Sequence, residues 1–129
     1  MDMKIGFPGG MRVEASFQGF SVVTDQPVSA GGEGSAPSPF GIFLASIPTC
    51  AGFFALRFCQ ERGIDPEGMS LSASFARDAA TGALTSVTLD LTLPPGFPEK
   101  YKKPILRAMD ECSVKRALMV PPKFEITLS

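Results

Sequence analysis

Three thiols, Cys50, Cys59 and Cys112, are the side chains of this sequence best suited to chemistry. The chain has no histidine, which excludes Ser-His-Asp and Cys-His nucleophile pairs, histidine metal ligands and imidazole bases. Three cysteines with no CxxC spacing are too few for an all-cysteine zinc site, so we expect no metal and no cofactor. Any enzymatic chemistry would therefore fall to thiols, carboxylates and guanidinium groups.

The surroundings of Cys50 are apolar in the sequence. Cys50 stands at helical spacing with Phe43, Ile47 and Phe54, so it lies on a dense apolar face of the predicted helix. Free cysteine often serves as a small buried hydrophobe. Burial of that kind raises the pKa of a thiol and makes it unreactive unless a cation lies nearby. An inert and a reactive Cys50 are both compatible with the pattern.

The other two cysteines differ in their neighbours. Cys112 ends a charged segment next to Lys115 and Arg116, and both cations could lower its pKa. Cys59 follows Phe58 in the last turns of an apolar helix, so we expect it to be a buried hydrophobe. Cys112 is thus a candidate for reactivity and Cys59 is not.

Alternating and helical patterns place these cysteines on an α+β framework. Residues 11–24 alternate, with a turn at Gln18-Gly19, and residues 69–93 form two alternating runs around a turn near residue 81, which predicts two hairpins. Helices are expected over the apolar run that ends before Gly63 and from about Pro98 to Cys112, with Ser113 capping a short helical turn. A last strand is predicted at 123–128. The predicted order is β-β-α-β-β-α-β in a single domain, 1–129.

The run from Pro39 to Leu56 contains no charged residue and allows two interpretations. By length it qualifies as a membrane span. However, the half-apolar strands need a covering helix, and no other helix of the sequence is apolar enough. A helix that is apolar on every side is expected where it is buried on every side. We therefore expect a core helix, and we expect a dimer because one short chain can hardly enclose it.

Charge and the N-terminal residues narrow the class of protein further. The formal net charge is −1, from 12 basic and 13 acidic residues, so no nucleic-acid partner and no membrane partner is expected. The start, MDMKIGFPGG, has no apolar signal region. An odd cysteine count without a signal also argues against a secreted disulfide scaffold. We expect a cytoplasmic protein.

Two segments resemble a known family. The stretch GGEGSAPSPFGIFLASIPTC resembles the loop and helix signature of the OsmC/Ohr superfamily, and ILRAMDECSVKRAL resembles its second cysteine segment. The similarity covers about residues 8–128 and leans toward the OsmC-like branch. It implies an OsmC-like fold, in which antiparallel sheets surround two central helices in an intertwined homodimer.

The resemblance also implies an activity, the thiol-dependent reduction of organic hydroperoxides. By position, Cys50 would be the peroxidatic thiol, Cys112 the resolving thiol, and an external dithiol the reductant. The small hydroperoxide would bind in an apolar pocket. The candidate substrate-binding residues are Phe40, Phe43, Ile47, Phe53 and Phe54.

The sequence departs from the family pattern in the residues that activate the thiol. Members pair the peroxidatic cysteine with an arginine that is held by a glutamate about ten residues upstream, where this chain has Phe40. Arg12 is the candidate arginine. Pro48, inside the predicted helix, would bend it, and the bend could either redirect Cys50 or serve packing alone. An alternative function is therefore a dimeric OsmC-like binding protein with an apolar pocket and little or no peroxidase activity.

Overall fold

The computed structural model describes all residues, 1–129, and the chain divides into two compact units, residues 1–45 and 46–129. The division falls within the long helix α1, Pro39–Glu61, close to Pro48. Proline has no N–H, so Pro48 cannot donate the helical bond to the carbonyl of Leu44. The single domain predicted from chain length stays a prediction, and each unit is described by itself.

The first unit is built on a three-stranded antiparallel sheet. Its strands are β1 (Lys4–Gly9), β2 (Arg12–Phe17) and β3 (Phe20–Thr24), in the order β1-β2-β3. Gln18 and Gly19 join β2 to β3, and both have positive φ, 49° and 78°. Two residues with positive φ give the turn that matches the twist of a tight hairpin. The predicted hairpin is confirmed, and β1 is an additional strand.

A buried aspartate organises the loop that follows β3. Asp25 accepts hydrogen bonds from the N–H groups of Gln26, Glu33 and Ser35 and from the Ser35 hydroxyl. The short 3₁₀ helix η1 (Val28–Ala30) lies within this loop. These bonds lower the pKa of Asp25 to about 2, with the Ser35 hydroxyl as the largest cause. The Gly- and Ser-rich segment is therefore an ordered loop that leads into α1.

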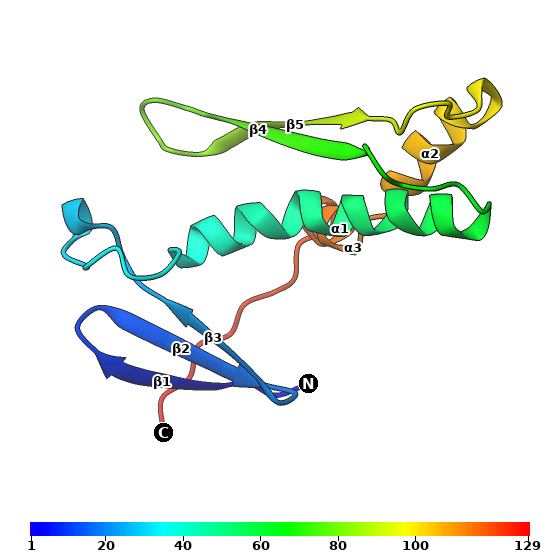
Figure 1. Ribbon diagram of the computed structural model, residues 1–129. Coiled ribbons are helices and arrows are strands. Elements are labelled where there is room, and N and C mark those ends of the chain that lie inside the picture. The colour runs from blue at the N-terminus through cyan, green and yellow to red at the C-terminus, as the bar shows by residue number, and fades with distance from the viewer. The chain divides into compact units, whose positions relative to one another are not determined.

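The second unit contains a hairpin and the rest of the helices (Figure 1). The hairpin pairs β4 (Ser70–Arg77) with β5 (Leu84–Thr92), as its alternation predicted. The chain then forms the 3₁₀ helix η2 (Glu99–Tyr101), α2 (Lys102–Met109) and α3 (Ser113–Met119). Pro104 lies in the first turn of α2, where its missing N–H removes no helical bond. The second predicted helix is thus split into η2 and α2.

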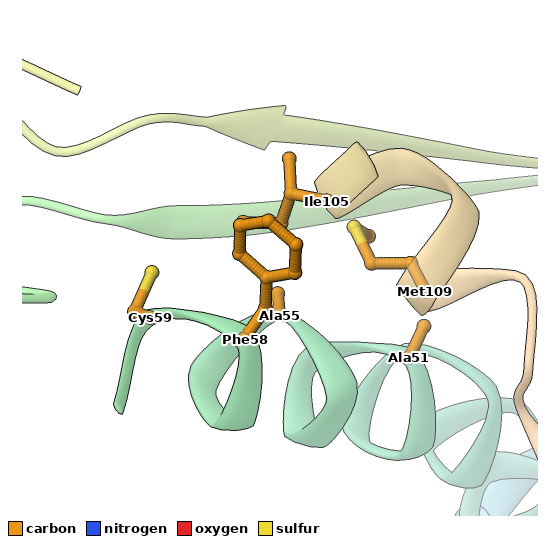
Figure 2. Packing of buried hydrophobic residues seen from close by; sticks show 6 residues of the cluster. All are labelled: Ala51, Ala55, Phe58, Cys59, Ile105 and Met109. Atoms are coloured by element: carbon orange, nitrogen blue, oxygen red, sulfur yellow. The ribbon is translucent and has the colours of Figure 1, made fainter. Parts of the chain in front are cut away.

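The core of the second unit lies between α1, α2 and one face of the hairpin. Figure 2 shows Ile105 and Met109 of α2 directed toward Ala51, Ala55 and Phe58 of α1. Leucines of β4 and β5 pack against this cluster. Helix α1 ends just before Gly63, as predicted, and Gly63 has φ of 64°. The N–H of Ile64 donates to the carbonyl of Cys59 at 2.9 Å and closes the last turn.

The chain covers only one stripe of α1. The buried residues of this helix recur every three or four positions: Ile47, Ala51, Ala55, Phe58 and Cys59. The helix is long and apolar enough to cross a membrane by length and composition, but core helices pass the same test. Burial on every side, which we expected for so apolar a helix, is not reached within one chain.

Two expected details of the fold are wrong. Residues 121–129 form no strand, and Phe124, Ile126 and Leu128 are exposed. An extended segment becomes a strand only when another strand supplies hydrogen bonds, and nothing in the chain pairs with this one. The cap of α3 is Cys112 rather than Ser113, which is the first residue of that helix. The observed order is three strands, α1, two strands, α2 and α3, which is an α+β fold as predicted.

Candidate functional site

Cys50 and Cys112 lie together at the point where α1 meets the start of α3. Cys50 is half-buried on α1, and its Sγ lies 3.7 Å from the Oγ of Ser113. Cys112 is only 2% exposed, and its Sγ accepts a hydrogen bond from the N–H of Lys115 at 3.4 Å. The two side chains are close enough for each thiol to change the pKa of the other. The structure thus brings together two cysteines that are far apart in the sequence.

The surroundings give the two thiols opposite tendencies to ionise. Partial burial disfavours the thiolate of Cys50, but hydrogen bonds from Cys112, from the N–H of Val114 and from Ser113 outweigh it and lower the pKa of Cys50. Burial raises the pKa of Cys112, which also serves as donor to Cys50. Hydrogen bonds to a thiolate favour ionisation. The thiol of Cys50 therefore ionises more readily than the thiol of Cys112.

Cys59 takes no part in this pair. It is fully buried, and its thiol donates a weak hydrogen bond to the sulfur of Met69 at 4.0 Å. Burial raises the pKa of Cys59, and the nearby charge of Arg62 offsets this only in part. The interpretation of Cys59 as a core hydrophobe agrees with this environment.

A cavity of about 320 Å³ lies beside the thiol pair. Cys112 lines it, together with Ile47 and Ala51, which flank Cys50 on α1. Asp110 and Lys115 supply its charged groups and form an ion pair with each other. The remaining lining is apolar and comes from β5, α2 and α3: Val87, Leu89, Leu106, Met109 and Leu118. The cavity can therefore hold a small apolar molecule next to Cys112.

The predicted aromatic pocket residues lie in several different places. Ile47 lines the cavity beside Cys112. Phe40 and Phe43 belong to the first unit, where their rings are 5.4 Å apart. Phe53 is 55% exposed, with its ring 5.2 Å from that of Phe54. Of the five candidates, only Ile47 lines the cavity of the thiol pair.

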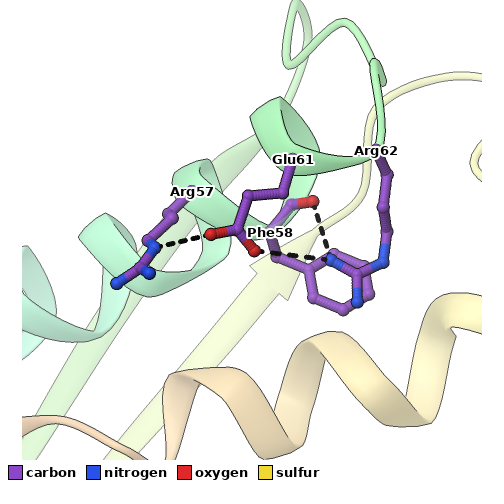
Figure 3. Close-up of polar contacts among 4 residues, drawn as sticks. All are labelled: Arg57, Phe58, Glu61 and Arg62. Carbon is purple, nitrogen blue, oxygen red and sulfur yellow. Dashed lines mark hydrogen bonds and ion pairs between the residues drawn. The ribbon is translucent and has the colours of Figure 1, made fainter.

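Phe54 lines a second cavity, of about 340 Å³, at the end of α1. Figure 3 shows the charged residues that line it near the end of α1: Glu61 accepts a hydrogen bond from Arg57 at 2.7 Å and lies 4.0 Å from Arg62. The Arg62 guanidinium stacks 3.5 Å from the centre of the Phe58 ring. Its Nη1 also donates to the carbonyl of Phe58. These bonds connect the charged groups to one another and close the end of the helix.

Arg12, the arginine predicted to activate Cys50, lies in the first unit. Arg12 begins β2 in the first unit, and its Nε donates to the carbonyl of Gly9 at 3.2 Å, across the β1–β2 turn. Its role as the activating cation of Cys50 stays a prediction. No group of three or more cysteine, aspartate and glutamate side chains gathers anywhere in the chain.

Sequence reasoning missed the part played by the start of α3. The N–H of Val114, and both the N–H and the hydroxyl of Ser113, act on Cys50, and the N–H of Lys115 acts on Cys112. A cysteine placed directly before a short helix was the available signal, because the first N–H groups of a helix have no partners within it. The sequence instead suggested the side chains of Lys115 and Arg116 as the groups that lower a thiol pKa.

Comparison with known proteins agrees with this fold. The family described as OsmC-like protein matches residues 32–127. No curated protein matches the chain. A crystal structure from Psychrobacter arcticus, described as an osmotic stress induced and detoxification response protein, has a TM-score of 0.75 at 21% identity, over 89% of this chain and 85% of that one.

Two further solved structures resemble the chain. The OsmC-like protein of Mycoplasma pneumoniae has a TM-score of 0.71 at 14% identity, over 92% of this chain and 86% of that one. The organic hydroperoxide resistance protein OhrB of Bacillus subtilis has a TM-score of 0.54 at 19% identity, over 91% and 90%. Likeness at these identities shows the fold, and the family match covers most of the chain. The chain belongs to the OsmC-like protein family.

Proposed function

We propose that this protein is a thiol peroxidase that reduces organic hydroperoxides, with Cys50 as the peroxidatic and Cys112 as the resolving thiol. The observation that carries the proposal is the pairing of two thiols in space: half-buried Cys50, whose pKa is lowered, lies 3.7 Å from the hydroxyl of Ser113, the residue that follows buried Cys112, whose pKa is raised. Solved structures named as organic hydroperoxide resistance proteins share the fold. The apolar cavity beside Cys112 suits an alkyl group.

The chemistry needs only these two sulfurs and an external reductant. The thiolate of Cys50 attacks the distal oxygen of the hydroperoxide, the O–O bond breaks, and the alkoxide leaves and takes a proton to become an alcohol. Cys50 is then a sulfenic acid. The thiol of Cys112 attacks that sulfur and releases water, which forms the Cys50–Cys112 disulfide. An external dithiol reduces this disulfide by exchange and is itself oxidised.

The test combines peroxide consumption with identification of the disulfide. We expect the protein to consume tert-butyl hydroperoxide in the presence of dithiothreitol, and mass spectrometry to find a Cys50–Cys112 disulfide when the dithiol is omitted. Cys50→Ser should abolish turnover. Cys112→Ser should leave a sulfenic acid that dimedone traps at Cys50. Cys59→Ser is the matched control and should keep full turnover, because Cys59 lies apart from the pair. Consumption no faster than that by free thiol would refute the proposal.

The second candidate is a binding protein without efficient peroxide chemistry. Phe40 stands where related proteins carry the glutamate that holds the arginine, and Arg12 bonds to the carbonyl of Gly9. The apolar cavity would then bind a small hydrophobic ligand. An environment-sensitive dye such as ANS, displaced by a short-chain alcohol without any peroxide turnover, would favour this candidate.

We further propose that the protein is a cytoplasmic homodimer. Phe53 and Leu56 leave an apolar side of α1 uncovered, and the C-terminal segment exposes an alternating set of apolar residues. The strands β1 and β3 are the unpaired edges of the first unit's sheet, and an exposed strand edge pairs readily with an extended segment. A second copy of the chain could cover the apolar side of α1 and could pair its C-terminal segment with an edge strand.

Sedimentation equilibrium in detergent-free buffer tests the dimer. We expect twice the mass of the chain, and Phe53→Asp should shift the equilibrium toward the monomer because it puts a charge on the uncovered side of α1. Thr88→Asp is a control that adds the same charge at an exposed polar position of β5, outside α1. A chain that stays monomeric at high concentration, or is soluble only in detergent, would contradict the proposal.

A further inference from the structure

We propose that Ser113 is a positioning residue whose hydroxyl donates a hydrogen bond to the thiolate of Cys50 and holds it for attack. This inference rests on the proposed function, in which Cys50 is the nucleophile. It gives Ser113 a role other than the helix cap that its place in the sequence predicted.

The geometry of the α3 start fixes Ser113 in place. Cys112 caps the helix, since its Sγ accepts from the N–H of Lys115 at 3.4 Å and its carbonyl accepts from the N–H of Arg116 at 3.1 Å. Ser113 is the next residue, so its backbone is already set by these two bonds. Its Oγ lies 3.7 Å from the Sγ of Cys50, within hydrogen-bonding distance for sulfur.

A hydroxyl at this position selects between the two states of Cys50. A serine hydroxyl has one proton to donate, and a thiolate is a far better acceptor than a thiol because it carries the charge. The hydrogen bond from Ser113 to Cys50 therefore strengthens when Cys50 ionises. It also directs the sulfur of Cys50 toward the start of α3, next to Cys112. The same hydroxyl would stabilise the reactive form and keep it within reach of its resolving partner.

Other titratable groups surround the pair and must be considered with Ser113. The side chain of Cys112 lowers the pKa of Cys50, while burial raises the pKa of Cys112 itself. Asp110 and Lys115 lie beside Cys112 in the cavity wall, but they form an ion pair. The bonds that lower the pKa of Cys50 come from Cys112, Ser113 and Val114, and Ser113 contributes both its side chain and its N–H. Only the side-chain part is removed by substitution.

The experiment compares threonine with valine at position 113, because they have nearly the same shape and differ in the hydroxyl. In the full chain, the rate of iodoacetamide alkylation at Cys50 is measured from pH 5 to 10 by peptide mass spectrometry. Losing one hydrogen bond of ordinary strength should lower the thiolate fraction at pH 6 by about 3- to 10-fold in Ser113→Val and Ser113→Ala. Ser113→Thr should stay within about twofold of the natural chain. Ser72→Ala, on an exposed part of β4, is the control and should change nothing.

The outcomes separate this inference from the proposed function. A raised midpoint for valine but not for threonine supports the role of the hydroxyl, whether or not the protein turns over peroxide. Equal midpoints for threonine and valine would overturn it, even if peroxide turnover is rapid. Slow alkylation of buried Cys59 in every variant shows that the fold is kept. If valine raises the midpoint while the natural chain consumes no peroxide, the hydroxyl's role stands and the proposed function is refuted.

Discussion

Ile105 connects the stability of the second unit to the placement of Cys112, and replacing it by alanine tests that link. Ile105 is 0% exposed and packs in the cluster between α2 and α1 (Figure 2). The change removes three buried carbons, worth about 2.4 kcal/mol in transfer free energy at roughly 0.8 kcal/mol each. The cavity left behind adds to this, so we expect a loss of about 3 kcal/mol of unfolding free energy, within the usual 2–5 kcal/mol for such changes.

The expected change is large enough to measure by heat or denaturant. For 129 residues, the entropy of unfolding is about 0.27 kcal/mol/K, so a loss of 3 kcal/mol lowers the Tm by about 11 °C. Differential scanning calorimetry at fixed protein concentration gives this value. Because α2 leads directly to Cys112, formation of the Cys50–Cys112 disulfide after one dose of peroxide should also slow, at a temperature where the variant remains folded.

The neighbouring residue Leu106 provides the control for this prediction. Leu106 lies on the same helix but is 58% exposed, so Leu106→Ala should cost less than about 1 kcal/mol, as surface substitutions do. Equal losses for Ile105→Ala and Leu106→Ala would refute the assignment of Ile105 to the core. If Ile105→Ala loses the expected stability but forms the Cys50–Cys112 disulfide at an unchanged rate, the link between α2 packing and Cys112 is refuted.

Three further outcomes follow from other residues. The pKa of Asp25 is about 2 in the folded protein, below its unfolded value, so its contribution to stability is complete above about pH 4 and is lost as the pH falls toward 2. The difference in urea midpoint between the natural chain and Asp25→Asn should therefore shrink from about pH 4 to about pH 2. A difference that stays constant over this range would contradict the prediction. Gly32→Ala should lower the Tm, because a Cβ there overlaps the carbonyl of Gln26, whereas Gly6→Ala, with open space around it, should leave it nearly unchanged. At pH 7.5 iodoacetamide should modify Cys50 well before Cys59, whose pKa is raised by burial, and peptide mapping that found Cys59 modified first would be evidence against the assigned nucleophile.

The sequence predicted those parts of the fold that depend on local alternation. Two strictly alternating runs between Met69 and Leu93 predicted β4 and β5. Gly63 marked the end of α1, because a positive φ favours glycine. The strand β1 was missed since its KIGFPG segment contains a proline and two glycines, which are weak strand formers. The C-terminal segment alternates as a strand should, but pairing needs a partner that local pattern does not supply.

The pocket was harder to predict than the thiols. Family resemblance selected Cys50 and Cys112, while the residues themselves allowed inert cysteines as well. The run from Pro39 to Leu56 in α1 has no charged residue, so its sequence gives no indication of which side faces the cavity. Aromatic residues were chosen for their size, but the walls beside Cys112 come mainly from β5, α2 and α3. The backbone donors of α3 were invisible for a different reason, because any residue type can provide an N–H.

The position of the thiol pair within the chain separates two steps of the proposed cycle. Cys50, Cys112 and the donors at the start of α3 all belong to residues 46–129. Condensation of a sulfenic acid with its neighbour therefore draws on nothing that precedes Ser46, whereas assistance from Arg12 would have to come from the other unit. If Arg12 activates Cys50, damage to the N-terminal sheet should slow oxidation of Cys50 by peroxide and leave formation of the Cys50–Cys112 disulfide unchanged.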